Sequence, residues 1–449
     1  MGNTRWVRTA RRHRPTTTAA GRAGRHRRRR LRPLRHPHHL RLARRRNAAV
    51  LGAGLLTFAG VCVCIASAWP HDSPLVPRNG GLLEGDTTWA WVYLIGEISA
   101  FTAYVVGLLL LRRAAVRLTL VATLAVAIQL APLGAPLLIS SDAWTYWDYA
   151  RIAFVHDANP YAQPPSDFPD DPAYPYMGGA YHDTTSVYGP LFTLASEPVA
   201  GAAGSSADAA AWLFKSLAAL AMLGTVALTA LLARRRAYAA ALVGWNPLLA
   251  LHFAGGGHND AWMALLVMAA LALGASGRRQ WAGAAWVAAI LIKWIAVVFL
   301  PLRALEARAR GRRVGHLGFA VAALVLAAVA SAQFGWHWLE AFGPLARNAN
   351  KETEFALPHR LQELGVPREV ALGLFAAAFA LAYLWLARQA WRGRARLGLA
   401  AGLLLCASPY LVPWYAVWAI PVAASEDDPP AQWLAVAISA YLLRQRVPI

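Results

Sequence analysis

Hydrophobic residues occur in long runs along most of this 449-residue chain, many of them close to 20 residues in length. A run of about 20 apolar residues, when helical, matches the hydrocarbon thickness of a lipid bilayer. The pattern predicts membrane-spanning helices near residues 48–69, 89–111, 118–139, 208–232, 238–253, 259–276, 281–301, 315–334, 368–390, 397–410, 412–424 and 431–443. We therefore expect an all-α polytopic integral membrane protein with about 11–12 transmembrane helices.

Composition excludes a soluble globular protein. Hydrophobic residues make up 57% of the chain and charged residues only 15%, whereas soluble domains carry about a quarter charged residues. The three cysteines lie inside apolar runs, and Cys62 and Cys64 have no nearby histidine or acid to complete a metal site. We expect no disulfide framework and no metal site at these cysteines.

The net charge of +21 belongs to one segment, because residues 1–46 hold 17 arginines and no acid and leave +4 for the rest. Such a low-complexity segment cannot build a core, so we expect a disordered, Arg-rich cytoplasmic tail that precedes a transmembrane domain over 47–449. Directly before a first span, the tail is typical of a positive-inside anchor near anionic lipids. Nucleic-acid binding is disfavoured, because no aromatic residues interleave the arginines beyond Trp6.

With the tail in the cytoplasm, alternation of the spans places loop 140–207 outside, and loop 335–367 also outside if the arginines at 303–313 are inside. One conflict arises, because Arg278 and Arg279 lie before segment 281–301 and the 303–313 cluster lies after it. The two groups of arginines cannot both be cytoplasmic if segment 281–301 crosses the membrane once. We expect one segment between 238 and 301 to be short, broken or re-entrant.

Loop 140–207 carries eight acids against one basic side chain, Arg151, together with twelve aromatic residues and eight prolines. Asp142, Tyr146 and Tyr149 fall at i, i+4 and i+7, which places them on one face of a helix lying at the membrane interface. Asp142 either caps that helix or is a carboxylate that takes a proton from a hydroxyl. Asp148 is expected to pair with Arg151.

Two tripeptides subdivide the rest of this loop. Asn159-Pro160-Tyr161 should end the first interfacial helix. Tyr188-Gly189-Pro190 opens an apolar stretch of 15 residues, which is too short to span the bilayer and predicts a second interfacial helix.

Gly255-Gly256-Gly257-His258-Asn259-Asp260 predicts a break followed by a helix start. Free N–H groups at that start would favour an anion, and ionisable groups near a membrane indicate a site. The alternative is that Asn259 or Asp260 only caps the next span.

Lys293 is the thirteenth residue of a 21-residue apolar segment, so its ammonium group needs a partner. That partner is a ligand phosphate, or else Glu97 or another carboxylate. Lys215 lies nearer a membrane end and is expected to be structural. Further on, Pro409 and Pro413 break an apolar run beside Trp414 and Tyr415, which either stack on a sugar or belong to the aromatic belt at the membrane surface.

These segments, in this order over about residues 118–420, resemble the GT-C superfamily of membrane glycosyltransferases. More narrowly, they resemble the polyprenol-phosphomannose-dependent α-1,6-mannosyltransferases. The resemblance rests on Asp142–Tyr149, Asn159–Tyr161, Tyr188–Pro190, Asn246-Pro247 with Gly256–Asp260, Lys293 with Pro301, and Pro413–Tyr415. The chain departs from the pattern in having two spans before the Asp142 loop and in its Arg-rich tail.

The resemblance implies an inverting transfer of a hexose, most simply mannose, from a polyprenyl-phosphate sugar to a glycan or glycolipid acceptor outside the plasma membrane. Asp142 would be the general base, and His258 and Lys293 would face the leaving phosphate. Substrate-binding residues would be Tyr146, Tyr149, Tyr188, His258, Asn259, Asp260, Lys293, Trp414 and Tyr415. No cofactor is implied beyond the polyprenyl-phosphate-sugar donor substrate, and a divalent metal is left open. The partners are the bilayer, the donor and the acceptor. The alternative class is a transporter or lipid-linked-sugar flippase.

Overall fold

The computed structural model describes residues 37–78, 81, 85–349 and 351–449. Within these ranges the regular structure is helical, without a strand, and one isolated β-bridge joins Arg78 to Gly81. The expected all-α fold is confirmed. Residues 1–36 of the expected tail lie outside the described ranges, whereas residues 37–46 form the start of the first helix. That difference has a simple cause, since Leu, Arg and Ala are strong helix formers that extend the apolar helix after them.

The α-helices of the described residues are α1 (Pro37–Ser67), α2 (Thr87–Leu111), α3 (Leu118–Leu130), α4 (Asp142–Phe154), α5 (Pro190–Ala203), α6 (Ala207–Leu232), α7 (Arg236–Gly244), α8 (Pro247–Ala250), α9 (Asp260–Ala275), α10 (Arg279–Ile292), α11 (Phe299–Ala309), α12 (His316–Phe334), α13 (Phe342–Ala349), α14 (Leu357–Glu363), α15 (Arg368–Trp391), α16 (Leu397–Ala407), α17 (Ile420–Ser425) and α18 (Pro429–Tyr441). Short 3₁₀-helices are η1 (Ala131–Gly134), η2 (Pro165–Asp167), η3 (Gly179–Tyr181), η5 (Trp294–Val298), η6 (His337–Ala341) and η7 (Pro413–Trp418), and η4 (Leu251–Gly255) is a π-helix.

Among the described residues, five helices are long and apolar enough to cross a membrane: Arg45–Ser67 of α1, and all of α2, α6, α12 and α15. The pair α7 and Pro247–Gly255 passes the same test but is bent by 53° at its break. The other predicted spans are shorter or interrupted helices, because Gly, Pro and charged residues end them early. The chain is a multi-pass membrane protein, but it has fewer full-length spanning helices than its hydrophobic runs indicate.

The conflict at segment 281–301 is resolved by a break at Lys293. This residue has an extended backbone (φ −150°, ψ 119°) between α10 and η5. The chain then returns, because Arg279 at the start of α10 and Arg303 in α11 line the same cavity. The segment is therefore broken and re-entrant, as expected, and both of its arginine-rich flanks lie at one end of the helices.

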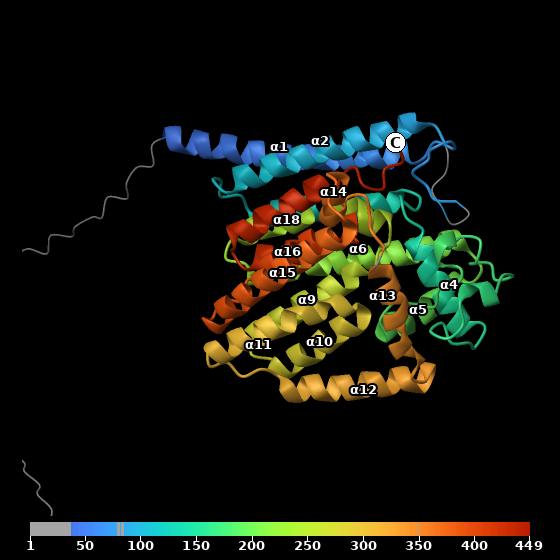
Figure 1. Ribbon diagram of the computed structural model, residues 1–449. Coiled ribbons are helices and arrows are strands. Elements are labelled where there is room, and N and C mark those ends of the chain that lie inside the picture. Colours follow the sequence, from blue (N-terminus) through green and yellow to red (C-terminus); the bar gives the residue numbers. More distant parts are fainter. Residues whose placement is uncertain (1–36, 79–80, 82–84, 350) are drawn as a thin grey trace, which may run out of the picture. The chain divides into compact units, whose positions relative to one another are not determined.

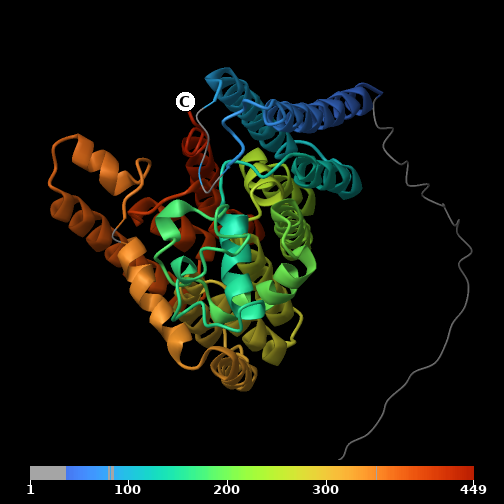
Figure 2. The same cartoon turned by 90° about the vertical axis from the view of Figure 1, so that its right-hand side faces the viewer.

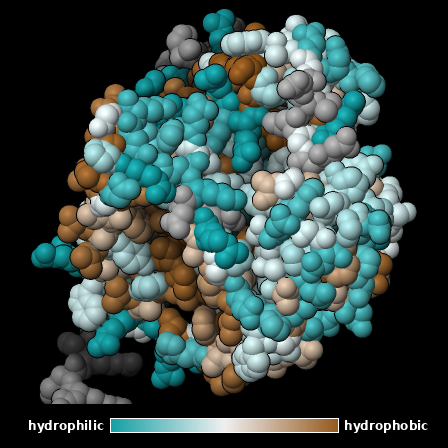
Figure 3. Space-filling model, turned by 45° about the vertical axis from the view of Figure 1, so that its right-hand side comes forward, coloured by the Kyte–Doolittle hydropathy of each residue, from teal (hydrophilic) through white to brown (hydrophobic). Residues whose placement is uncertain are grey.

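Other arginines gather at that same end, which we call the arginine end. Arg112 lines one cavity with Arg234 and Arg235, and arginines of α11 and of the α15–α16 connection line another beside the end of α6. Segment 140–207 lies at the opposite end. Figures 1 and 2 show α4 and α5 covering one end of the helices that follow α5, and Figure 3 shows that the surface there is largely hydrophilic.

Candidate functional site

A cavity of about 410 Å³ lies at the end of the helices that carries segment 140–207. Its walls come from α4, the residues before α5, the break at Lys293, and residues 408–418. Seven of the residues expected at a site line it: Asp142, Tyr146, Tyr149, Tyr188, Lys293, Trp414 and Tyr415. The other three, His258, Asn259 and Asp260, are buried directly behind this wall. Breaks in helices, rather than helix interiors, thus supply most of the polar groups.

Asp142 is the first residue of α4, and its side chain does not cap the helix, because the N-cap position belongs to Ser141. Its Oδ2 lies 3.0 Å from His258 Nδ1 and accepts a hydrogen bond from the Tyr146 hydroxyl at 3.4 Å. The side chain keeps 26% exposure, since it faces the cavity. Burial raises the pKa of this carboxyl, but the bond to His258 and the charges of His258, Arg446 and Lys293 outweigh it, so the pKa lies below its usual value. Asp142 is therefore a carboxylate at neutral pH.

His258 is fully buried and reaches Asp142 because of the glycines before it. Gly257 has φ +75°, a conformation that L side chains rarely adopt. The imidazole stacks on Trp414 with ring centroids 3.7 Å apart, and its Nε2 has no hydrogen-bond partner among the described residues. The structure thus places His258 behind Asp142 rather than in the cavity, which differs from the expectation that it faces a phosphate.

One donor at the start of α9 is satisfied inside the protein, because the N–H of Asn259 donates to the Tyr146 hydroxyl at 3.4 Å. The N–H groups of Gly256 and Gly257 close the turn before this start, where they bond to the carbonyls of His252 and Phe253. That the start of α9 favours an anion stays a prediction.

Lys293 and Asp260 form a buried ion pair, with Nζ 2.6 Å from Oδ2. The other oxygen of Asp260 accepts a bond from Trp418 Nε1 at 2.6 Å. Neither Asn259, the N-cap residue of α9, nor Asp260 makes a side-chain cap bond, so their alternative role as simple caps is not observed. The partner of Lys293 is thus Asp260 and not Glu97, whose Oε1 has no partner in the described structure.

Lys293 also faces the cavity, with a fifth of its side chain exposed. Its Nζ lies 4.9 Å from the ring centroid of Tyr415 and 5.8 Å from that of Trp418. These two rings stack on each other at 3.9 Å. Trp414 is only 5% exposed. Trp414 and Tyr415 therefore belong to the wall of the cavity, together with a cation, and not to an aromatic belt facing lipid headgroups.

The remaining motifs of segment 140–207 hold the wall in place. Asn159 Nδ2 donates to the carbonyl of Phe334 at 2.7 Å, and the Tyr161 hydroxyl donates to the carbonyl of Tyr188 at 3.0 Å. Gly189 packs directly on the end of α10, so closely that a Cβ there would stand 2.0 Å from the Leu291 carbonyl oxygen. These contacts tie the segment to α12 and to the Lys293 break.

The expected pairing of Asp148 with Arg151 is wrong. Arg151 Nε instead lies 2.8 Å from Asp171 Oδ1, in the loop after α4. Asp171 also accepts a hydrogen bond from the Ala173 N–H through the same oxygen, so its carboxylate is held in place beside Arg151. Burial, together with repulsion from Asp171, raises the pKa of Asp148 to about 7 despite the nearby charge of Arg151.

Sequence reasoning missed several wall residues, chiefly Tyr181, Tyr410 and Trp418. Trp418 follows Trp414 at i+4, a spacing that could have placed both on one face of a helical turn. Tyr181 gives no such signal, because it ends the three-residue helix η3 in the long segment between α4 and α5. The described residues contain no group of three or more His, Cys, Asp or Glu that could hold a metal ion.

The fold and the site together define a helical membrane protein with a polar and aromatic cavity built at one end, where several helices are broken. The chain belongs to the alpha-(1->6)-mannopyranosyltransferase family. The model of that family's N-terminal domain matches residues 46–309, and a model described as the MptB C-terminal domain matches residues 360–448. The resemblance found in the sequence is confirmed.

The chain is also similar to alpha-(1->6)-mannopyranosyltransferase A of Mycobacterium tuberculosis (strain ATCC 25618 / H37Rv). The two are 29% identical over 342 residues, which is 65% of this chain and 63% of that relative. The chain thus matches less than two thirds of the relative's length. No solved structure matches this chain significantly.

Proposed function

We propose that this protein transfers a mannosyl residue from polyprenyl-phosphate mannose to a hydroxyl of a glycan or glycolipid acceptor, with inversion at the anomeric carbon. Membership of the mannopyranosyltransferase family supports mannosyl transfer. The observation that carries the mechanism is a single ionised carboxylate, Asp142, that faces a cavity opposite apolar and cationic groups.

Asp142 acts as the general base in this proposal. Its carboxylate accepts the proton of the acceptor hydroxyl while that oxygen attacks the anomeric carbon. The bond between this carbon and the phosphate oxygen breaks, and the electron pair leaves with polyprenyl phosphate. Attack from the face opposite the leaving group inverts the configuration, so an α-linked product requires a β-linked donor. His258 holds the carboxylate in position and stabilises its charged form.

Lys293 stabilises the leaving phosphate. Its ammonium lies at the cavity wall, where negative charge develops as the glycosidic bond breaks, and a pre-positioned cation in such a site lowers the barrier. Asp260 neutralises part of this charge but also fixes its position. A fixed cation costs no reorganisation during the reaction.

The polyprenyl chain leaves the cavity along an apolar side formed by Ile292, Ile295 and Val297. Val297 is 53% exposed, so this side reaches the outer surface of the helices. A donor dissolved in the bilayer can then enter sideways, with its phosphate at the cavity and its chain in lipid. The donor carries its own activated bond, and the proposal requires no cofactor and no metal ion.

We place the cavity on the outer face of the plasma membrane. Cytoplasmic loops carry an excess of Lys and Arg, and the arginine end is the opposite end from the cavity. Tyr149, Tyr188, Trp414 and Tyr415 line the space for the sugar rings, which stack well on aromatic faces.

The test is transfer of radiolabelled mannose from polyprenyl-phosphate mannose to a short α-mannoside by purified protein in lipid. We expect Asp142→Asn to lose about 100-fold or more in kcat, the usual range for removal of a general base. Asp170→Asn, an exposed carboxylate of the same segment, is the matched control and should stay near the wild-type rate. Equal activity of wild type and D142N would overturn the role of Asp142. A wild-type protein that moves the lipid-linked sugar across vesicles without transferring it would instead be a flippase.

A further inference from the structure

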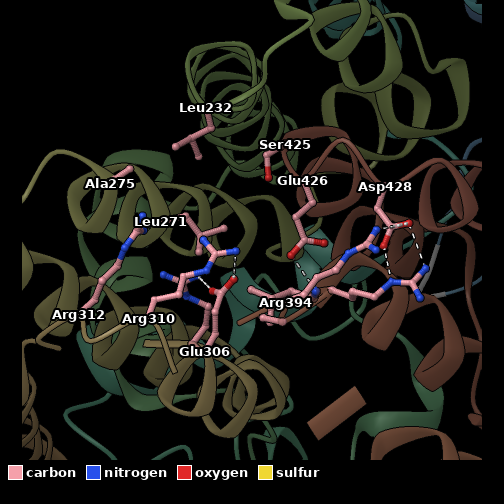
Figure 4. Close-up of a pocket in the computed structure, with 14 residues that line it drawn as sticks. Leu232, Leu271, Ala275, Glu306, Arg310, Arg312, Arg394, Ser425, Glu426 and Asp428 are labelled. Atoms are coloured by element: carbon pink, nitrogen blue, oxygen red, sulfur yellow. Dashed lines mark hydrogen bonds and ion pairs between the residues drawn. The ribbon is translucent and has the colours of Figure 1, made fainter. Parts of the chain in front are cut away.

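Two arginine-lined cavities lie side by side at the arginine end, and they differ in how their charge is balanced. The first has a volume of about 300 Å³ and is lined by five arginines and three acids. Figure 4 shows these acids bonded to their neighbours: Glu306 to Arg310 at 3.1 Å, and Asp428 to the Arg396 guanidinium at 2.6 Å. The Glu426 carboxylate accepts hydrogen bonds from the first two N–H groups of α16. The acids of this cavity are therefore paired, Glu306 with arginines at the end of α11 and Asp428 with arginines just before α16.

The second cavity, of about 570 Å³, is lined by Arg279, Arg303, Arg312, Arg313 and His316 and by no acidic residue. Arg303 pairs with Glu306 of the first cavity. Arg279, Arg312 and Arg313 make no ion pair with any described residue, and all three are exposed. Ala275, Arg303 and Arg312 line both cavities, and Figure 4 shows Arg312 beside Ala275 without a bond to an acid. The positive charge of the second cavity is therefore uncompensated.

Two helix starts add to this charge. α10 begins at Arg279 and α12 at His316, and the N-cap residue of neither helix, Arg278 or Gly315, makes a side-chain cap bond. A helix start carries a partial positive charge and unpaired N–H groups. The two starts are held together by glycines: a Cβ at Gly315 would stand 1.8 Å from the Arg279 carbonyl oxygen, and the Gly318 N–H donates to Gln280 at 2.7 Å.

The rest of the wall is apolar. It is formed by small residues of α9, α10 and α11 with Trp286, Leu300 and Phe319 among them. An apolar hollow with cations at one rim matches a molecule that has an acyl chain and an anionic head. Because the first residue of α10 lies in this cavity and its last residue in the catalytic cavity, the two sites are about 21 Å apart along the helix.

We propose that this second cavity is a binding site for an anionic phospholipid of the leaflet at the arginine end. Arg279, Arg312 and Arg313 bind its phosphate, and one acyl chain fills the hollow between α9, α10, α11 and α12. Basic pockets between membrane helices bind anionic headgroups in this way. The lipid secures the open ends of the α9–α10 and α11–α12 connections.

The test is native mass spectrometry of the purified full chain, stripped of lipid and then titrated with phosphatidylglycerol or with phosphatidylcholine. We expect one saturable phosphatidylglycerol molecule and no comparable retention of phosphatidylcholine. The triple variant R279Q/R312Q/R313Q should bind it at least tenfold more weakly, since each such charge near a membrane contributes roughly 1 kcal/mol.

Matched controls separate this site from the general charge of the membrane end. The triple variant R113Q/R117Q/R388Q removes the same charge from exposed arginines that line neither cavity, and it should bind phosphatidylglycerol as wild type does. Ala304→Trp fills the hollow but keeps the arginines, and it should weaken phospholipid binding. The proposal fails if both triple variants lose binding equally. It also fails if inorganic phosphate or polyprenyl phosphate displaces the phospholipid at equimolar concentration.

Discussion

His258 illustrates how one buried side chain can set the chemistry of another. It contributes no surface to the cavity, yet its hydrogen bond and charge oppose the effect of burial on Asp142. Because a lowered pKa keeps the carboxyl deprotonated into acidic solution, Asp142 is in the form that the proposed general base requires across the neutral range.

Replacing this histidine should therefore shift the pH dependence of the reaction. In His258→Gln the charge is lost and burial dominates, so the pKa of Asp142 rises. The acidic limb of kcat/KM against pH should move to higher pH, with the rate recovering as pH increases. His337→Gln, an exposed histidine paired with Glu340, is the control and should leave the profile unchanged. An unshifted limb in H258Q would show that His258 does not tune the base.

The Lys293–Asp260 pair allows stability and catalysis to be separated. Lys293→Met leaves Asp260 buried with only the Trp418 donor, and removing one partner of a buried pair costs about 3 kcal/mol or more. We expect a lower melting temperature and a large loss of kcat. The double variant K293M/D260N should regain most of the stability, because no buried charge is left, but not the activity. Recovery of activity in the double variant would contradict a role of Lys293 at the leaving phosphate.

At the scale of elements, the cavity exists because its helices end there. Hydrophobic periodicity predicts helices well, and it located α2, α6, α12 and α15 almost to the residue. It does not show where an apolar run turns back, since Lys293 looks the same in sequence whether its helix continues or breaks. The charge conflict around 281–301 did reveal the broken segment. The sequence also predicted that Asp142, Tyr146 and Tyr149 share one face of α4, and all three line the cavity. Their spacing along a single helix is enough to determine that face.

Contacts between distant segments were not predictable in the same way. Arg151 pairs with Asp171 rather than with Asp148, because the loop after α4 folds back and brings the Asp171 carboxylate to the guanidinium. Lys293 paired with Asp260, 33 residues earlier, rather than with Glu97. The sequence did indicate that the charged groups of Arg151 and Lys293 each need a partner, since isolated buried charges are costly. Which carboxylate serves as that partner is determined only by the three-dimensional fold.

The junction of α5 and α10 provides a test at this scale. In Gly189→Ala the new Cβ would collide with the Leu291 carbonyl oxygen, a backbone atom that cannot rotate away. We expect a destabilisation of about 1–3 kcal/mol and a lower kcat, because Lys293 is displaced with the end of α10. Gly179→Ala is the matched control in the same segment, since nothing lies within 4 Å of the added group. Equal melting temperatures for G189A and wild type would contradict the close packing.

At the scale of the whole molecule, five arginine-rich connections lie at one end of the helices: α2–α3, α6–α7, α9–α10, α11–α12 and α15–α16. This arrangement agrees with one orientation in the membrane, with the cavity on the far side from the arginines. The agreement depends on the re-entrant α10–α11 segment, without which the Arg278 and Arg303 flanks would face opposite compartments.

Cysteine labelling measures this directly. In a chain with Cys62, Cys64 and Cys406 changed to alanine, single cysteines would replace Ser276, Ala309 or Asp170, all of them exposed. A membrane-impermeant maleimide should label D170C in intact cells, and S276C and A309C only after permeabilisation. Labelling of S276C and A309C from opposite sides would contradict the re-entrant segment.

The Lys293–Asp260 pair also bears on biosynthesis. Asp260 opens α9 and Lys293 follows the last residue of α10, so the ion pair closes the mouth of a helical hairpin. If the helices entered the translocon singly, each would bring an unpaired ion toward hydrocarbon, which costs about 2.5–3.5 kcal/mol for each charge near the centre of a span. A hairpin that enters as one unit brings a neutral pair instead. We therefore expect α9 to remain at the translocon, outside the hydrocarbon, until α10 has been synthesised and the two helices insert together.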